Sequence, residues 1–139
     1  MKIHLYYFGK ARDAHANAIA EDYVRRVSRY AKVEMAEIRA GRADPWAKHP
    51  SAYMVCLDPA GKRQDSAAFI AMVERVEREA RDVVFVVGGA DGLPAGWGGR
   101  ADLLLSLSPM TYPHELARVM LAEQIYRAFT TLRGHPYPR

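Results

Sequence analysis

Three short polar segments of this sequence follow apolar runs and combine glycine, proline and hydroxyl side chains. They are LDPAGK at 57–62, GGADGLP at 88–94 and SLSPMTYPH at 106–114. Glycines that follow a buried strand allow positive φ angles and close approach of the backbone to a ligand. Pro109 and Pro113 each remove an N–H donor and restrict the preceding residue, so they stiffen the third segment. Hydroxyl groups in a stiff loop can cap that loop or bind a polar ligand.

Each segment also has an ordinary explanation. GGADG fits a tight turn, and LDPAGK fits a proline–glycine turn with Lys62 exposed. The glycines do not form G-x-G-x-x-G at the start of a helix, and GK[ST] does not occur, so neither a Rossmann fingerprint nor a P-loop is present. His114 falls on the first turn of the following helix, where a histidine is more often structural or solvated unless other site residues surround it.

Strands and helices alternate along the chain and would bring the three segments together. Apolar patterns predict strands at 2–9, 33–38, 53–58, 83–87 and 101–108, helices at 16–30, 66–81 and 114–132, and a loop at 39–52. The central strands are apolar throughout, which predicts an α/β fold with a mostly parallel sheet and helices on both faces. Ligands of such sheets bind beyond the carboxyl ends of the strands, so the three segments should converge at one edge.

The helix expected at 114–132 is apolar around most of its circumference. Its polar exceptions gather on one side and are Glu123, Gln124, Arg127, Thr130 and Thr131. A helix of this kind is buried on more than one side, and in a small chain the second side predicts a partner subunit. Glu123 and Arg127 have the i,i+4 spacing of an ion pair, which is either a surface salt bridge or a site element near a dimer axis.

Length and composition predict one domain, residues 1–139, with net charge +4 and a pI near 9.3. Arg25, Arg26 and Arg29 cluster, and arginine suits phosphate recognition, although arginine richness can also reflect the base composition of the gene. Cys56 is the only cysteine, which excludes an internal disulfide and a cysteine-based metal site. The N-terminus lacks the features of a signal peptide, and no window of eighteen apolar residues predicts a membrane span. We therefore expect a cytoplasmic protein with no metal and no membrane partner.

Several of these stretches resemble one known family. LDPAGK, FVVGGADG, LSLSPMTYPHELARVMLAEQIYRA and the terminal HPYP occur in the order and spacing typical of the RlmH family of the SPOUT class. These are ribosomal RNA large-subunit methyltransferases. The resemblance is strong over the C-terminal two-thirds and weaker at MKIHLYYFGK. It implies an α/β knot fold, in which the C-terminal segment threads through a loop as a trefoil knot, an exception to the rule that chains are unknotted.

The resemblance also implies an activity and its site. A homodimer would use S-adenosylmethionine to methylate N3 of a pseudouridine in the helix 69 loop of 23S rRNA, within the assembled ribosome. The implied cofactor-binding residues are Leu57, Gly88, Gly92, Leu107, Ser108, Pro109, Met110, Thr111 and Tyr112. Candidates for the general base, or for a cation beside the developing anion, are His114, Glu123, Arg127, Tyr137 and Arg139, and the choice among them stays open. The tail residues would act in the partner's site.

Two features depart from the family pattern. The family tail usually reads H-P-Y-H before a basic residue, whereas this tail has Pro138 in place of the second histidine. The segment 39–52 is shorter than is usual in the family. RNA contacts that relatives make from that region are therefore not expected to carry over, whereas the knot does not depend on it. A competing hypothesis is a ribosome-binding protein without enzymatic activity that keeps the SPOUT fold. A third is a nucleotide-binding regulator, which the missing nucleotide fingerprints disfavour.

Overall fold

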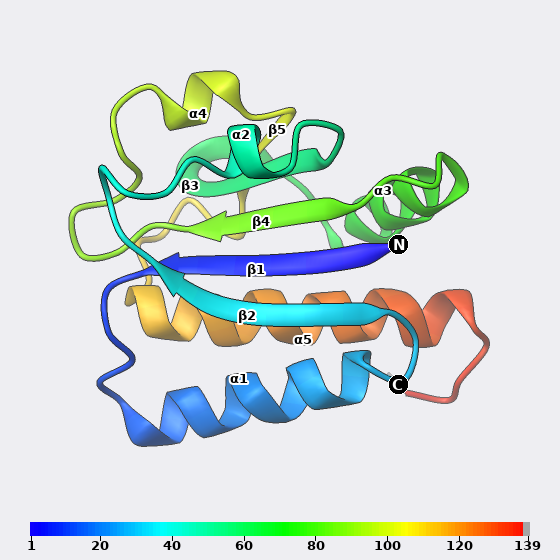
Figure 1. The fold of residues 1–139 in the computed structure, drawn as a ribbon. Coiled ribbons are helices and arrows are strands. Elements are labelled where there is room, and N and C mark those ends of the chain that lie inside the picture. The colour runs from blue at the N-terminus through cyan, green and yellow to red at the C-terminus, as the bar shows by residue number, and fades with distance from the viewer. Residues whose placement is uncertain (138–139) are drawn as a thin grey trace.

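A parallel five-stranded sheet forms the centre of the molecule in the computed structural model, which describes residues 1–137. The strands are β1 (Lys2–Phe8), β2 (Lys32–Ile38), β3 (Tyr53–Arg63), β4 (Val83–Val87) and β5 (Leu103–Ser106), in the order β2-β1-β4-β3-β5. Every pair of neighbouring strands is parallel, so the strands end at one common edge, on the left in Figure 1. The predicted parallel α/β sheet is confirmed.

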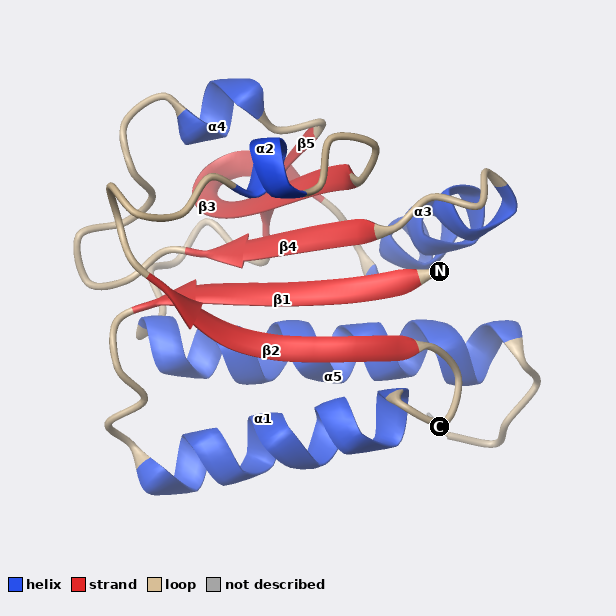
Figure 2. Cartoon of the chain, in the orientation of Figure 1, coloured by secondary structure: helices blue, strands red, loops and turns tan. Residues whose placement is uncertain are grey.

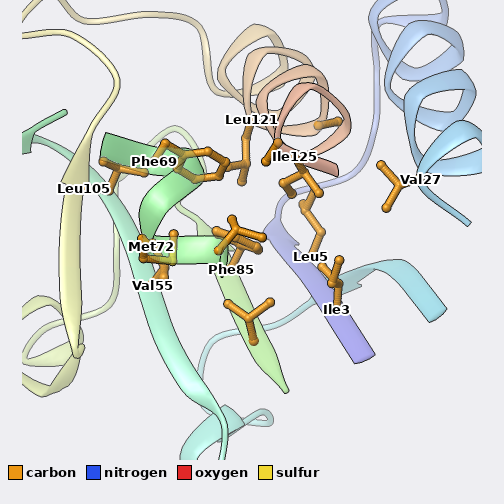
Figure 3. Close-up of a cluster of buried hydrophobic side chains, with 14 of the residues drawn as sticks. Ile3, Leu5, Val27, Val55, Phe69, Met72, Phe85, Leu105, Leu121 and Ile125 are labelled. Carbon is orange, nitrogen blue, oxygen red and sulfur yellow. The ribbon is translucent and has the colours of Figure 1, made fainter. Parts of the chain in front are cut away.

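The two faces of the sheet are covered unequally. The long helices α1 (Ala14–Val27), α3 (Ser66–Arg78) and α5 (His114–Leu132) pack on one face, around a core that includes Phe69, Phe85 and Leu121 (Figure 3). The opposite face is covered by the short helices α2 (Pro45–Lys48) and α4 (Trp97–Arg100) and by loops (Figure 2). Helices therefore lie on both faces as predicted, but the long ones share one face.

Helices α1 and α5 lie side by side and run in the same direction, with their N-terminal ends at the carboxyl edge of the sheet (Figure 1). Asp13 caps α1 by accepting from the backbone N–H groups of His15 and Ala16. Glu115, in the first turn of α5, accepts from the N–H groups of Arg12 and Asp13. Both helix starts are thus tied together beside the loops that follow the strands.

Four local features differ from the prediction. The segment 57–62 is not a separate loop, because β3 continues to Arg63 and pairs with β5 again after a register shift between Leu57 and Lys62. The predicted loop 39–52 contains α2, which begins with the cap Asp44 and Pro45 at the first turn. Helix α4 was not predicted, and β5 is shorter than the run 101–108.

The segment 39–52 is held to the sheet by a polar network beneath it. His4, which is 3% exposed, contacts Glu34 Oε1 through Nδ1 at 2.6 Å, and the Tyr6 hydroxyl contacts His49 Nε2 at 2.8 Å. Burial, and then the negative charge of Glu34, raise the pKa of Tyr6 to about 12. The hydrogen bond from His4 holds the pKa of Glu34 below its usual value. Tyr6 thus stays protonated and can donate to Glu34 while His49 Nε2–H donates to Tyr6.

Candidate active site

A cavity of about 540 Å³ opens at the carboxyl edge of the sheet. Its walls come from the irregular middle of β3, the ends of β4 and β5, the loop after β4, the elbow 107–113 and the first turn of α5. Val87, Leu105 and Leu107 supply apolar walls, while polar groups include Asp58 and His114. The volume lies in the range of about 300–1,000 Å³ that is typical of small-molecule sites. The three segments singled out in the sequence therefore meet at one cavity.

The loop after β4 depends on two glycines for its shape. A Cβ atom on Gly88 would lie 2.6 Å from the carbonyl carbon of Gly92 and 2.9 Å from the amide nitrogen of Leu93. Gly92 has a φ of +77°, which side-chain-bearing residues rarely adopt, and its amide donates to the Gly89 carbonyl. Gly88 is therefore required first by the backbone of its own loop, and this loop forms one wall of the cavity.

The elbow between β5 and α5 is fixed by its hydroxyl groups. Ser106 is buried, and its Oγ donates to the Pro59 carbonyl at 3.0 Å, which joins the start of the elbow to the middle of β3. Ser108 Oγ accepts from the Met110 amide at 3.0 Å. Pro113 precedes the helix with φ −52°, an angle to which its ring is already restricted. The serines and prolines thus shape a rigid wall, while Met110 remains 70% exposed at the rim.

A buried arginine holds the start of α5 in place. Arg118 is 1% exposed, stacks over the Tyr7 ring at 4.0 Å and donates to Asn17 Oδ1 at 3.1 Å. Its Nη2 atom lies 3.9 Å from Glu115 Oε1 and makes no hydrogen bond within residues 1–137. These contacts link α5 to α1 and β1, so they fix His114 at the cavity. Sequence reasoning missed this role because the polar contacts of Arg118 reach distant parts of the chain.

A second polar cluster lies farther along α5, away from the cavity. Arg127 donates to both carboxylate oxygens of Glu123, and the Tyr137 hydroxyl donates to Glu123 Oε2. Burial, and then the hydrogen bond to Glu123, raise the pKa of Tyr137. The hydrogen bond to Glu123 likewise raises the pKa of Arg127. At neutral pH Tyr137 is therefore a hydrogen-bond donor and Arg127 a cation.

The predicted cofactor residues gather as expected. The cavity is lined by Leu57, Gly88, Gly92, Leu107, Ser108, Met110, Thr111 and Tyr112, whereas Pro109 does not line it. Lining residues that were not predicted are mostly neighbours of these in sequence, and Asp58, at the end of the apolar run of β3, adds a carboxylate. Whether these residues bind a ligand stays a prediction.

The predicted catalytic residues do not gather in one place within the chain. His114 lines the cavity, while Glu123, Arg127 and Tyr137 form the separate cluster. Glu123 follows His114 by nine positions of α-helix, which is about 14 Å along the axis. Arg139 lies outside the described residues. Within the described part, no group of His, Cys, Asp or Glu side chains is placed to hold a metal ion.

Nearly the whole chain matches a known protein family. Residues 1–138 match the family described as "Predicted SPOUT methyltransferase". The chain therefore belongs to the SPOUT methyltransferase family, as the sequence motifs predicted.

Two relatives that match nearly the full chain carry the same name. A protein of Solibacter usitatus named "Ribosomal RNA large subunit methyltransferase H" is 64% identical over 139 residues, which is 100% of both chains. A protein of the same name from Sorangium cellulosum is 42% identical and covers 93% of both chains. These similarities confirm the resemblance to the RlmH family.

Solved structures share the fold at low sequence identity. A structure from Neisseria gonorrhoeae described as a methylase family protein superposes with a TM-score of 0.58 at 10% identity, over 89% of this chain and 81% of that one. A second, from Haemophilus influenzae, gives 0.57 at 10% identity, over 99% and 70%. At such identity the likeness concerns the fold alone. No helix of the described residues is long and apolar enough to cross a membrane.

Proposed function

We propose that this chain methylates large-subunit ribosomal RNA, with S-adenosylmethionine as donor and N3 of a pseudouridine in the helix 69 loop of 23S rRNA as acceptor. The observation that carries the proposal is the cavity at the carboxyl edge, where three segments far apart in sequence meet. The names of the full-length relatives support ribosomal RNA as the substrate class. A ribosomal substrate would place the reaction in the cytoplasm.

The residues of the cavity fit S-adenosylmethionine. The molecule joins a planar adenine and a ribose to a charged amino acid, so a mixed apolar and polar lining is required. Leu57, Leu107 and Met110 would pack against the adenosine, while Asp58 and the Ser108 hydroxyl offer polar contacts. When bound, the cofactor supplies a methyl group that its sulfonium already activates, so the protein mainly has to position the acceptor. The trefoil knot stays a prediction, and the hydrogen bond from Ser106 to Pro59, which ties the start of the elbow to β3, is compatible with it.

The acceptor chemistry requires removal of a proton from N3 of the base and stabilisation of the resulting anion. His114 is the candidate base that borders the cavity. Tyr137 does not fit the role of base, since its raised pKa keeps it protonated, but it can orient the target base as a donor. Arg127 retains its positive charge and would stabilise the anion that forms on the target nucleobase.

We propose that a homodimer assembles the complete site. Large apolar side chains are exposed beside the cavity and along α5, notably Met110, Leu116 and Met120 at 70%, 46% and 51%. An exposed apolar stripe of this kind favours a protein partner, and two-fold symmetry would pair the stripe with itself. If two α5 helices pack in opposite directions, the cavity end of one meets Glu123 and Tyr137 of the other. The separation of about 14 Å along one helix would then be bridged by the second subunit.

Mixing two inactive variants tests the composite site. Gly88→Val should disable the cavity, and deletion of residues 136–139 should disable the tail. A mixed dimer would retain one intact site, so random mixing should restore about a quarter of wild-type activity. Failure of the mixture to exceed its components, although mixed dimers form, would exclude a site shared in this way.

Incubation with labelled S-adenosylmethionine and unmethylated ribosomes tests the reaction itself. Digestion of the rRNA and mass spectrometry should reveal labelled N3-methylpseudouridine. Cofactor binding without transfer, to ribosomes shown to contain the pseudouridine, would count against this acceptor. Absence of cofactor binding would favour the second candidate, a ribosome-binding protein that keeps the fold without activity.

A further inference from the structure

Two arginines lie against a group of tyrosines beside the C-terminal segment. The Arg26 guanidinium lies 5.4 Å from the centre of the Tyr23 ring and 5.7 Å from that of Tyr126, and Arg127 lies 5.6 Å from that of Tyr137. The rings of Tyr126 and Tyr137 are 4.7 Å apart. We call these five residues the arginine–tyrosine cluster. It joins the end of α1, the middle of α5 and the tail into one continuous group.

The charge of this region is positive and incompletely neutralised. Arg25 and Arg26 share the single carboxylate of Asp22, at 3.0 and 2.9 Å. Arg127 shares Glu123 with Tyr137. Three guanidinium groups thus face two carboxylates, and the side chain of Arg26 is 45% exposed. The ion pair with Asp22 uses Nη2 of Arg26, so Nε–H and the N–H groups of Nη1 can each still donate a hydrogen bond to a phosphate oxygen.

An arginine supported by aromatic faces suits RNA. The rings limit the conformations of the guanidinium, which lowers the entropy lost when it binds a phosphate. Single-stranded nucleic acids are bound by such combinations, in which arginines contact phosphates and exposed rings stack on bases. The helix dipole alone also favours arginines in the last turn of α1, but it does not explain their alignment over the rings of α5 and the tail.

We propose that Arg26 contacts a backbone phosphate of the substrate RNA next to the target nucleotide, on the surface formed by the arginine–tyrosine cluster. This inference rests on the proposed ribosomal RNA substrate. In the proposed dimer, Tyr137 enters the partner's site, so Arg26 would lie beside the RNA that occupies that site. Arg26 then acts in RNA binding and takes no part in cofactor binding or proton transfer.

Arg26→Ala and a matched control test the proposal. Arg78→Ala is the control, because Arg78 is also exposed and also forms an i,i+4 ion pair, with Glu74, on a different helix. Each substitution removes one positive charge. Methyl transfer to unmethylated ribosomes is measured at several salt concentrations between about 50 and 200 mM, the range in which phosphate contacts weaken strongly. Cofactor affinity and oligomeric state are measured for each variant.

Loss of one phosphate contact predicts a specific pattern. Arg26→Ala should raise KM for ribosomes about fivefold or more at low salt and flatten the slope of log affinity against log salt by about 0.7–0.9. The values of kcat and of Kd for S-adenosylmethionine should stay within about twofold. Arg26→Lys should keep the salt slope, since lysine still provides a point charge. Arg78→Ala should match the wild type.

Three results would overturn the proposal. The first is an Arg26→Ala variant whose KM and salt slope equal those of Arg78→Ala. The second is a raised KM with an unchanged salt slope, which indicates a contact other than phosphate. The third is dissociation of the dimer, which would assign Arg26 to the subunit interface. If the wild type methylates ribosomes and Arg26→Ala does so equally well, only the inference about Arg26 is refuted. If the wild type neither binds nor methylates ribosomes, both the inference and the proposed function are refuted.

Discussion

Replacement of Gly88 by alanine places one methyl group where the loop after β4 has no room. The new carbon would lie 2.6 Å from one backbone carbon, 2.9 Å from the Gly92 carbonyl oxygen and 2.9 Å from the Leu93 nitrogen, whereas nonbonded carbon atoms prefer about 3.5–4.0 Å. All three contacts are backbone atoms, so the loop itself has to move by about 1 Å. Overpacking of this kind costs about 1–3 kcal/mol of stability.

The same movement should damage the cavity, because Gly88, Gly92 and Leu93 all line it. A displacement of about 1 Å in a binding site can cost about 100-fold in function, so we expect Kd for S-adenosylmethionine to rise about 10- to 100-fold. Calorimetry gives the affinity, and thermal unfolding gives the stability. Gly99→Ala is the matched control, because a Cβ there meets no atom within 4 Å, and it should leave the affinity unchanged. If Gly88→Ala binds as tightly as wild type and unfolds at the same temperature, the steric reasoning is wrong.

Three further perturbations test other parts of the structure. Burial, followed by the charges of His4 and Lys48, lowers the pKa of His49 below its ordinary 6.5. The unfolded chain therefore binds more protons than the folded chain, and the stability should fall as the pH drops from about 7 to 5. In thermal unfolding, His49→Gln should make the stability depend less on pH over this range. Arg118→Ala should lower the free energy of unfolding, measured in urea, by about 3–5 kcal/mol. Arg118→Met should lower it by less, since methionine keeps part of the buried stem. Equal losses in the two variants would contradict a stabilising role of that stem. Tyr137→Phe removes the hydrogen bond to Glu123 and should reduce methyl transfer about tenfold with unchanged cofactor affinity, and full activity would remove Tyr137 from the proposed site.

Much of the fold follows from local patterns in the sequence. The helix predicted at 114–132 agrees with α5 at both ends, and the apolar runs at 53–58 and 83–87 both form central strands. The helix predicted at 66–81 ends earlier, at Arg78, and Ala80 then adopts a left-handed φ of 54°. Helix α1 begins two positions before the predicted start because Asp13 caps it. A carboxylate before a helix is a readable cap, but the apolar stripe that defined the prediction starts later.

Features that depend on distant contacts were not predictable in this way. The extension of β3 through 57–62 requires pairing with β5, and α2 is held by Trp46 against Trp97 and by the network around Tyr6. A four-residue helix has little intrinsic stability, so its presence depends on that packing.

In the candidate site, too, local features could be predicted from the sequence and spatial relations could not. Glycine, proline and serine marked the cavity loops because they constrain the local backbone. The separation of His114 from Glu123 follows from helix geometry, and it is the reason for proposing that two subunits share the site.

Mapping the position of methyl transfer on 23S rRNA tests the central claim most directly. A methyl group on N3 of a pseudouridine blocks the base-pairing edge, so reverse transcription should stop at that nucleotide. After incubation of unmethylated ribosomes with the protein and S-adenosylmethionine, we predict one new stop, in the helix 69 loop, which is absent with Gly88→Val. Incorporation of label without a stop in this loop, or stops at other sites, would contradict the proposed acceptor.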